Sequence, residues 1–63
     1  MKRRDLIRHL LNHGCQHDHE GGNHTLWKNL VNGSMAGVPR HRELSNELAK
    51  AICKELGIPL PAR

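Results

Sequence analysis

The sequence predicts an α+β fold: a helix, three antiparallel strands and a second helix, with both helices on one face of the sheet. Two segments, 3–13 and 45–56, space their apolar residues as helices do, whereas the residues between them alternate and contain turn signals. Each helix has one apolar face to bury, and one face of a three-stranded sheet can cover both. The other sheet face is then left to solvent or to a partner. The 63 residues form a single domain, 1–63.

The first helix is predicted over residues 3–13 and ends at Gly14. Its apolar stripe is formed by Leu6, Ile7, Leu10 and Leu11. The second helix, 45–56, has Ser45 as its N-cap and ends at Gly57. Its apolar stripe is formed by Leu48, Ala51, Ile52 and Leu56. Both stripes are typical of amphipathic helices that pack on a shared core.

The strands are predicted over residues 15–20, 24–31 and 34–38. Between the second and the third lies Asn32-Gly33, the strongest short-range hairpin signal in a sequence. The first strand is polar, and its composition would also suit a loop.

A glycine-rich loop, made of Gly21, Gly22 and Asn23, precedes His24 at the start of the second strand. Glycine is expected in such a tight turn because it tolerates positive φ. A histidine beside this turn is accessible to a large substrate, and the unperturbed pKa of histidine, about 6.5, suits proton transfer near neutral pH. His24 is therefore a candidate catalytic residue, although taken alone such a histidine is more often an ordinary polar residue.

The alternation of the second strand leaves two orientations open. Leu26 and Leu30 share a face with His24, whereas Trp27 and Val31 share the opposite face. If Trp27 and Val31 face the helices, His24 lies on the open face of the sheet. We expect Trp27, the single aromatic residue, in the core rather than stacked on a base.

The composition favours a polyanionic partner. The net charge is +4 and the isoelectric point is about 9.7, which suits nucleic acid but equally suits a basic soluble domain without that role. No apolar run approaches the roughly 20 residues of a membrane span, and no signal peptide is evident, so we expect a cytoplasmic protein that contacts no membrane. Cys15 and Cys53 are expected to be small buried apolar residues rather than a disulfide.

Cations gather at two places in the sequence. Three of them begin the first helix, where they oppose the helix dipole, so phosphate contact explains them as well as a solvated terminus does. Two others bracket His41 in the loop after the third strand. With one lysine of the second strand, the candidate RNA-binding residues are Lys2, Arg3, Arg4, Lys28, Arg40 and Arg42.

The other histidines invite a zinc interpretation. His9 and His13 are four apart on the first helix, and His17 and His19 alternate along the first strand. Against it, the sequence has neither a C-x-x-C nor an H-E-x-x-H motif. We therefore predict no metal site.

Four segments together resemble the HicA family, the toxins of bacterial toxin–antitoxin pairs: "MKRRDLIRHLLNHG", "EGGNH", "NGSMAGVPRH" and "LAKAICKELGI". The resemblance spans essentially the whole chain. It implies a fold like the double-stranded RNA-binding domain, an mRNA interferase activity that stops translation, and a HicB-like antitoxin that covers the active site. The family's catalytic histidine corresponds to His24. Where the family more often has Gly-Ser-His, this chain has Gly22-Asn23-His24, so a hydroxyl role at that position is not carried over.

The resemblance suggests a mechanism without a cofactor. RNA supplies its own nucleophile, the 2′-hydroxyl, so the enzyme must move protons and stabilise charge on phosphorus. His24 would be general base or acid, His41 the candidate second proton-transfer group, and Arg40, Arg42 or Lys28 would stabilise the phosphorane. mRNA is the expected substrate, read mainly through shape and backbone, and we expect no direct DNA binding by this chain alone.

Two alternatives belong to other classes. One is an RNA-binding module of the same fold without catalysis, and the other is a metal-binding or structural protein that uses His9, His13, His17 and His19.

Overall fold

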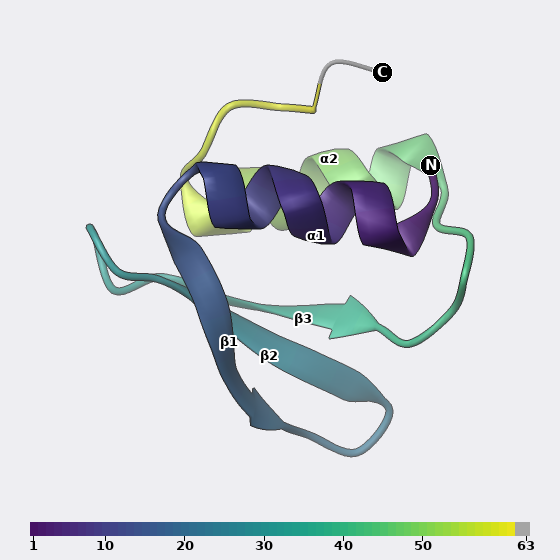
Figure 1. The fold of residues 1–63 in the computed structure, drawn as a ribbon, viewed down its shortest axis with the longest axis horizontal. Helices are drawn as coiled ribbons and strands as arrows, with labels where there is room; N and C mark the ends of the chain where they lie inside the picture. The colour runs from purple at the N-terminus through teal and green to yellow at the C-terminus, as the bar shows by residue number, and fades with distance from the viewer. Residues whose placement is uncertain (62–63) are drawn as a thin grey trace.

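A computed structural model describes residues 1–61 and has the predicted order of elements (Figure 1). The elements are α1 (Arg3–Asn12), β1 (Cys15–Glu20), β2 (His24–Asn29), β3 (Met35–Pro39) and α2 (Asn46–Leu56). The strands form one antiparallel sheet in the order β1-β2-β3. The α+β prediction is thus confirmed, including the strand character of polar β1.

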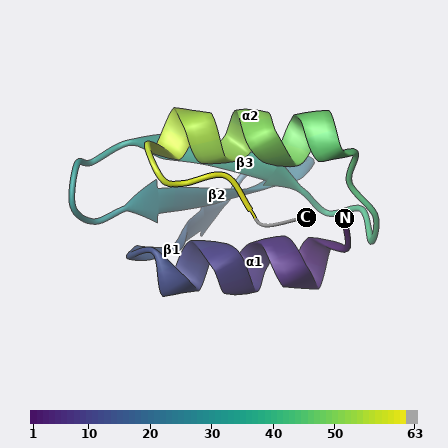
Figure 2. The ribbon, with the colours of Figure 1, turned by 90° about the horizontal axis from the view of Figure 1, so that it is seen from above.

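The two helices lie side by side on one face of the sheet and run in the same direction (Figure 2). Seen from above, α1 lies on the β1 side and α2 on the β3 side (Figure 2). A single apolar cluster lies between the helices and the sheet. Its largest fully buried side chains are Leu6, Leu10, Leu56, Val38 and Cys53. The opposite face of the sheet carries no helix.

The burial pattern of β2 decides which of its faces meets the helices. Thr25, Trp27 and Asn29 are buried, whereas His24 is exposed. Trp27 is only 6% exposed, which confirms its place in the core. Val31 does not share that face: it is 87% exposed, because β2 ends at Asn29 and Val31 lies in the turn that follows.

The helix ends are where the sequence predicts them. The Ser45 hydroxyl accepts a hydrogen bond from Leu48 N at 3.1 Å, the usual N-cap interaction. Gly57 ends α2 with a left-handed φ of +72°. The buried face of α1 is narrower than the predicted stripe, because Leu6 and Leu10 are buried but Leu11 is 56% exposed.

In α2 the buried face is turned by about one residue. Leu48 and Ala51 are exposed, whereas Ala49 and Cys53 join Ile52 in the core. The predicted and the observed stripes share Ile52 and Leu56. The observed stripe adds Ala49 and Cys53, two small side chains that let α2 lie close to β3. Helical spacing alone could not choose between them, because both satisfy the same period.

The turn between β2 and β3 is longer than the two residues predicted. It spans residues 30–34, and Asn29 N donates to Ser34 O at 2.8 Å across it. Its glycine, Gly33, has a positive φ of +79°. The reason is the Asn29 side chain, which is 4% exposed and donates to Leu56 O at 2.7 Å while accepting from Val31 N at 2.9 Å. These bonds draw the chain toward the end of α2 before a two-residue turn could form.

Candidate functional site

His24 begins β2 on the open face of the sheet, with its imidazole beside β3. A Cβ built on Gly37 would lie 3.4 Å from the His24 Cβ and 3.5 Å from two ring carbons. The imidazole therefore packs beside the backbone of Gly37, at a distance where a Cβ would touch it in van der Waals contact. Sequence reasoning missed Gly37, since a glycine inside a strand signals close approach but not of which group.

A shallow cavity of about 590 Å³ lies at His24. Its lining includes His41, so the two predicted proton-transfer groups share one concavity although they lie far apart in the sequence. The complete lining is Asn23, His24, Pro39, Arg40, His41 and Leu48. Because Leu48 belongs to the exposed edge of α2, this cavity joins the start of β2 to the segment between β3 and α2.

The loop before His24 does not use glycine in the predicted way. Neither Gly21 nor Gly22 has a positive φ; the positive values belong to Gly14, Gly33 and Gly57. Space favours glycine at position 21 instead, because a Cβ there would lie 2.8 Å from Leu26 Cδ2, whose side chain would have to move, and 3.3 Å from the His24 carbonyl. Gly21 N also donates to His24 O at 2.8 Å, which closes the turn without left-handed residues.

Arg40 binds this turn from the outside. Its Nη1 donates to Gly22 O at 2.7 Å, and its Nη2 donates to Gly21 O at 3.0 Å and to His24 O at 3.2 Å. Its Nε donates to Glu20 Oε1 at 3.1 Å, and Nη2 also contacts that oxygen. The guanidinium group that was predicted to contact RNA is thus hydrogen-bonded to four oxygen atoms of the protein.

Glu20 is the acidic partner of Arg40, and it was not among the predicted site residues. Hydrogen bonds from Arg40, and then from His17, lower the pKa of Glu20 to about 2. His17 Nε2 lies 2.8 Å from Glu20 Oε2, and Thr25 Oγ1 donates to Glu20 Oε1 at 3.3 Å. The only sequence signal was opposite charge, which does not identify a pair 20 positions apart.

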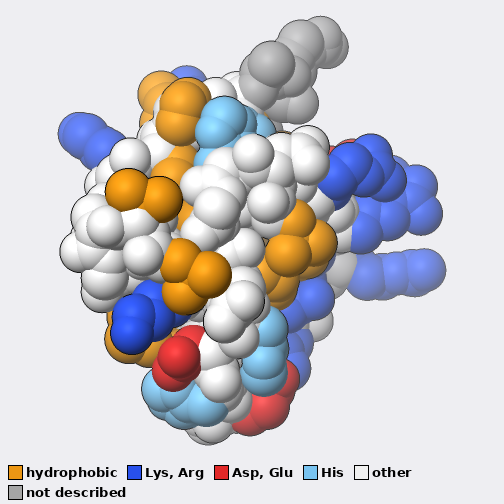
Figure 3. Space-filling view, turned by 60° about the vertical axis from the view of Figure 1, so that its left-hand side comes forward, with side chains coloured by type: hydrophobic (Ala, Val, Ile, Leu, Met, Phe, Trp, Pro, Cys, Tyr) orange, Lys and Arg blue, Asp and Glu red, His pale blue; other side chains and the backbone are white. Residues whose placement is uncertain are grey.

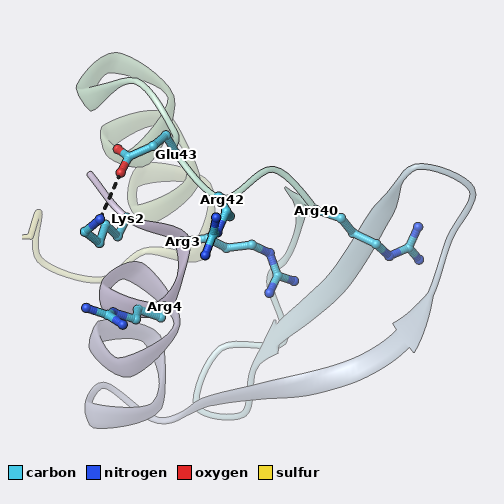
Figure 4. Close-up of a pocket in the computed structure, with 6 residues that line it drawn as sticks. All are labelled: Lys2, Arg3, Arg4, Arg40, Arg42 and Glu43. Carbon is cyan, nitrogen blue, oxygen red and sulfur yellow. Dashed lines mark ion pairs between the residues drawn. The ribbon is translucent and has the colours of Figure 1, made fainter.

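A second concavity, of about 560 Å³, is strongly basic (Figure 4). It is lined by Lys2, Arg3, Arg4, Arg40, Arg42 and Glu43, and we call it the basic pocket. Five of the six predicted RNA-binding residues therefore meet, and Lys28 lies apart on β2. The first turn of α1 and the loop after β3 are joined there because Arg3 N donates to Arg42 O at 2.8 Å.

The cations of the basic pocket differ in their partners. Lys2 pairs with Glu43 at 3.4 Å. Arg3 is held in place: its Nε donates to Pro39 O at 2.9 Å and its Nη2 to Thr25 Oγ1 at 3.2 Å. Within residues 1–61, the side chains of Arg4 and Arg42 make no hydrogen bond or ion pair, so these two are the cations most available to an anion.

The remaining histidines are dispersed. His9 Nε2 lies 2.7 Å from Pro59 O, beside the ring of His13, and His19 Nδ1 lies 2.6 Å from Asp18. In the part of the chain that the structure describes, no three His, Cys, Asp or Glu side chains converge on one point.

The two cysteines are reduced and buried, as expected for core residues. Burial raises the pKa of both the Cys15 and the Cys53 thiols. None of the helices in residues 1–61 has the length and apolar character needed to span a membrane.

Histidine and acidic side chains gather at one end of the molecule, and arginine and lysine side chains project from another side (Figure 3). A protein-family model described as the HicA toxin of bacterial toxin-antitoxin matches residues 3–58, which include every helix and strand and every residue that lines the two concavities except Lys2. No curated protein and no solved structure is significantly similar to the chain.

Proposed function

Because the chain belongs to the HicA toxin family of bacterial toxin–antitoxin systems, we propose that it is an mRNA interferase, an endoribonuclease that cuts mRNA and so inhibits translation. The observation that carries this proposal is the setting of His24. It is exposed at the start of β2, lies on the sheet face without helices, and shares a cavity with His41. A polynucleotide can reach such a site without displacing any element of the core.

The proposed reaction needs two proton transfers and an anion-stabilising group. His24 removes the proton of the 2′-hydroxyl, whose oxygen attacks the adjacent phosphorus, or it protonates the 5′-oxygen as that oxygen leaves. His41, which lines the same cavity, takes the complementary role. The products are a 2′,3′-cyclic phosphate and a free 5′-hydroxyl. Arg42, which contributes to the adjoining basic pocket, is the available cation for the charge that develops on phosphorus.

The basic pocket supports binding of the RNA backbone next to the cleavage site. Arg40 belongs to the linings of both concavities, so the two adjoin. Arg4 and Arg42 offer uncommitted guanidinium groups, which suit phosphate oxygens in two-pronged geometry. Contacts of this kind give affinity without base preference, consistent with a broad choice of mRNA.

The proposed protein partner is a HicB-like antitoxin. A toxin of such a pair must be silenced in the cell that makes it, and the open sheet face with the His24 cavity is the surface whose coverage would exclude RNA. We propose that the antitoxin covers this face.

Substitution of His24→Ala tests the catalytic proposal. We expect cleavage of an RNA oligonucleotide to fall by about 10²- to 10⁴-fold, with RNA affinity and melting temperature close to those of the parent protein. The side chain is exposed, and one imidazole adds little to phosphate binding. Activity should persist in a chelator, and the parent products should carry cyclic phosphate ends.

The alternative is an RNA-binding module of the same fold that does not cleave. It predicts the same RNA affinity in both proteins and no cleavage by either. If His24→Ala cleaves RNA at the parent rate, the catalytic proposal is wrong.

A further inference from the structure

We propose that Arg40 is a positioning residue: with Glu20 it forms a latch that holds the β1–β2 turn and thereby fixes the place of His24. This inference rests on the proposed function, because it assigns His24 the reaction. It replaces the more obvious role of Arg40, a direct contact with the phosphate of the substrate. We call the pair the Arg40–Glu20 latch.

The hydrogen bonds of Arg40 carry the proposal. A guanidinium has five N–H donors, and here Nε, Nη1 and Nη2 all donate to the protein. The acceptors are one Glu20 carboxylate oxygen and the carbonyl oxygens of Gly21, Gly22 and His24. A side chain engaged in this way lacks the free two-pronged edge that phosphate recognition uses.

The direction of the side chain agrees with its hydrogen bonds. Arg40 extends away from the other cations of the basic pocket and toward the β1–β2 hairpin (Figure 4). Arg3 and Arg42 lie together near the first turn of α1 in the same view (Figure 4). Arg40 therefore contributes its stem to the pocket and its charged group to the turn.

The turn needs such an external support. Two of its three residues are glycines, which have the largest backbone entropy to lose on ordering. Its internal closure is one backbone bond, from Gly21 N to His24 O. The same His24 oxygen accepts from Arg40, so the latch acts directly on the residue that carries the imidazole.

Glu20 connects the latch to the interior of the sheet. Its Oε1 accepts from Thr25 Oγ1, and Thr25 is 4% exposed on the helix-facing side of β2. The Thr25 hydroxyl in turn accepts from Arg3 Nη2 at 3.2 Å. A chain of hydrogen bonds thus runs from Arg40 through Glu20 and Thr25 to Arg3 of α1. It connects the exposed turn to the packed part of the fold.

The expected consequence is a loss in kcat rather than in substrate binding. Displacement of a catalytic group by about 1 Å can lower a rate by about 10²-fold. Loosening of the turn leaves the basic pocket intact, so the KM for RNA should change little. A phosphate ligand would behave in the opposite way, with a higher KM and a steeper effect on longer RNA.

The test compares Arg40→Gln with two variants that lose the same charge. Arg40→Gln should lower kcat for an RNA oligonucleotide by about 10- to 100-fold, with KM within about 2-fold of the parent. Arg4→Gln, in the basic pocket, should raise KM and retain kcat, because Arg4 is proposed only to bind the RNA backbone. Arg8→Gln is the remote control, because Arg8 pairs only with Asp5 on α1, and it should retain both constants. Arg40→Lys should not restore the rate, since an ammonium cannot reach four acceptors at once.

Glu20→Gln separates the two roles of Arg40 most sharply. If Arg40 positions the turn, loss of the carboxylate lowers kcat. If Arg40 is a phosphate ligand restrained by Glu20, freeing it retains or raises kcat and lowers KM, and the latch is refuted. Amide hydrogen exchange gives a second reading: Arg40→Gln should speed exchange at Gly21 N–H and leave Gly33 N–H, in the other turn, unchanged.

The outcomes distinguish this inference from the proposed function. If His24→Ala abolishes cleavage but Arg40→Gln and Glu20→Gln cleave with the parent kcat, the latch is wrong and the ribonuclease remains. If Arg40→Gln raises KM as Arg4→Gln does, Arg40 is a substrate ligand. If Arg40→Gln lowers the melting temperature, Glu20→Gln and the exchange measurement decide.

Discussion

The two hairpin turns of this sheet are held in opposite ways. The β2–β3 turn is held from within by Asn29, whose buried amide binds Leu56 O at the end of α2. Asn32 binds the same oxygen at 3.2 Å. The β1–β2 turn is held from outside by Arg40, an exposed side chain from the far end of β3.

This difference separates stability from function. A turn tied to a helix end through the buried amide of Asn29 cannot loosen without loss of core packing. A turn tied by one exposed guanidinium can loosen while the core persists, and this turn carries His24. The site residues thus lie where changes cost little free energy of unfolding, and the stabilising residues lie at the other end of the sheet.

The largest effect is expected at His41, in the cavity above the β1–β2 turn. His41→Ala should lower RNA cleavage by about 10²- to 10⁴-fold, because it removes the proposed second proton-transfer group. The pH–rate profile should lose one of its two limbs. His41 is exposed, so the melting temperature should not change, and an unchanged rate would leave His24 as the single proton-transfer group.

Asn29→Ala tests the other turn. It removes a buried donor to Leu56 O and a buried acceptor for Val31 N, and we expect the free energy of unfolding to fall by about 1–3 kcal/mol. Chemical denaturation measures this change. Cleavage per folded molecule should stay at the parent value, and Asn12→Ala, an exposed asparagine at the end of α1, is the matched control.

Gly57→Ala tests how closely α2 meets the β2–β3 turn. At φ +72° an alanine is strained, and its Cβ would lie 2.7 Å from Asn32 Nδ2. The expected loss of stability is about 1–2 kcal/mol. Gly22→Ala is the contrast from the other turn, with ordinary φ and no atom within 4 Å of the new Cβ, and thermal unfolding should show no loss there.

The smallest expected effect is the pH dependence of stability that Glu20 contributes. The pKa of Glu20 is lowered from its ordinary 4.5 to about 2 in the folded protein, so its contribution to stability is present above pH 4.5 and is lost as pH falls toward 2. Glu20→Gln should therefore have a lower melting temperature than the parent at neutral pH. That difference should vanish near pH 2, and a constant difference across this range would contradict the ion pair.

The order of elements and the helix caps were predictable from sequence because their signals are local. Ser45, Gly57 and the alternation of β2 each act within a few residues. The exact face of α2 was not predictable, since two stripes of equal period compete. The length of the β2–β3 turn was also missed, because the Asn29 amide reaches a carbonyl 27 positions away.

For the candidate site too, local features were predictable from sequence and long-range contacts were not. His24 was singled out by its turn, which alone left it more often an ordinary polar residue, and then by the family resemblance. The contact between Arg40 and Glu20 joins residues 20 positions apart, which composition cannot specify, and Arg40 was therefore grouped with the candidate RNA-binding cations. Gly21 was correctly placed in the turn but for the wrong reason, since its Cβ would collide with Leu26.

The most direct test measures kcat and melting temperature on the same preparations of His24→Ala and Asn29→Ala. We predict that His24→Ala loses cleavage and keeps the parent melting temperature. Asn29→Ala should lose several degrees of melting temperature and keep the parent kcat per folded molecule. Cleavage by His24→Ala at the parent rate would contradict the claim that the β1–β2 turn carries catalysis.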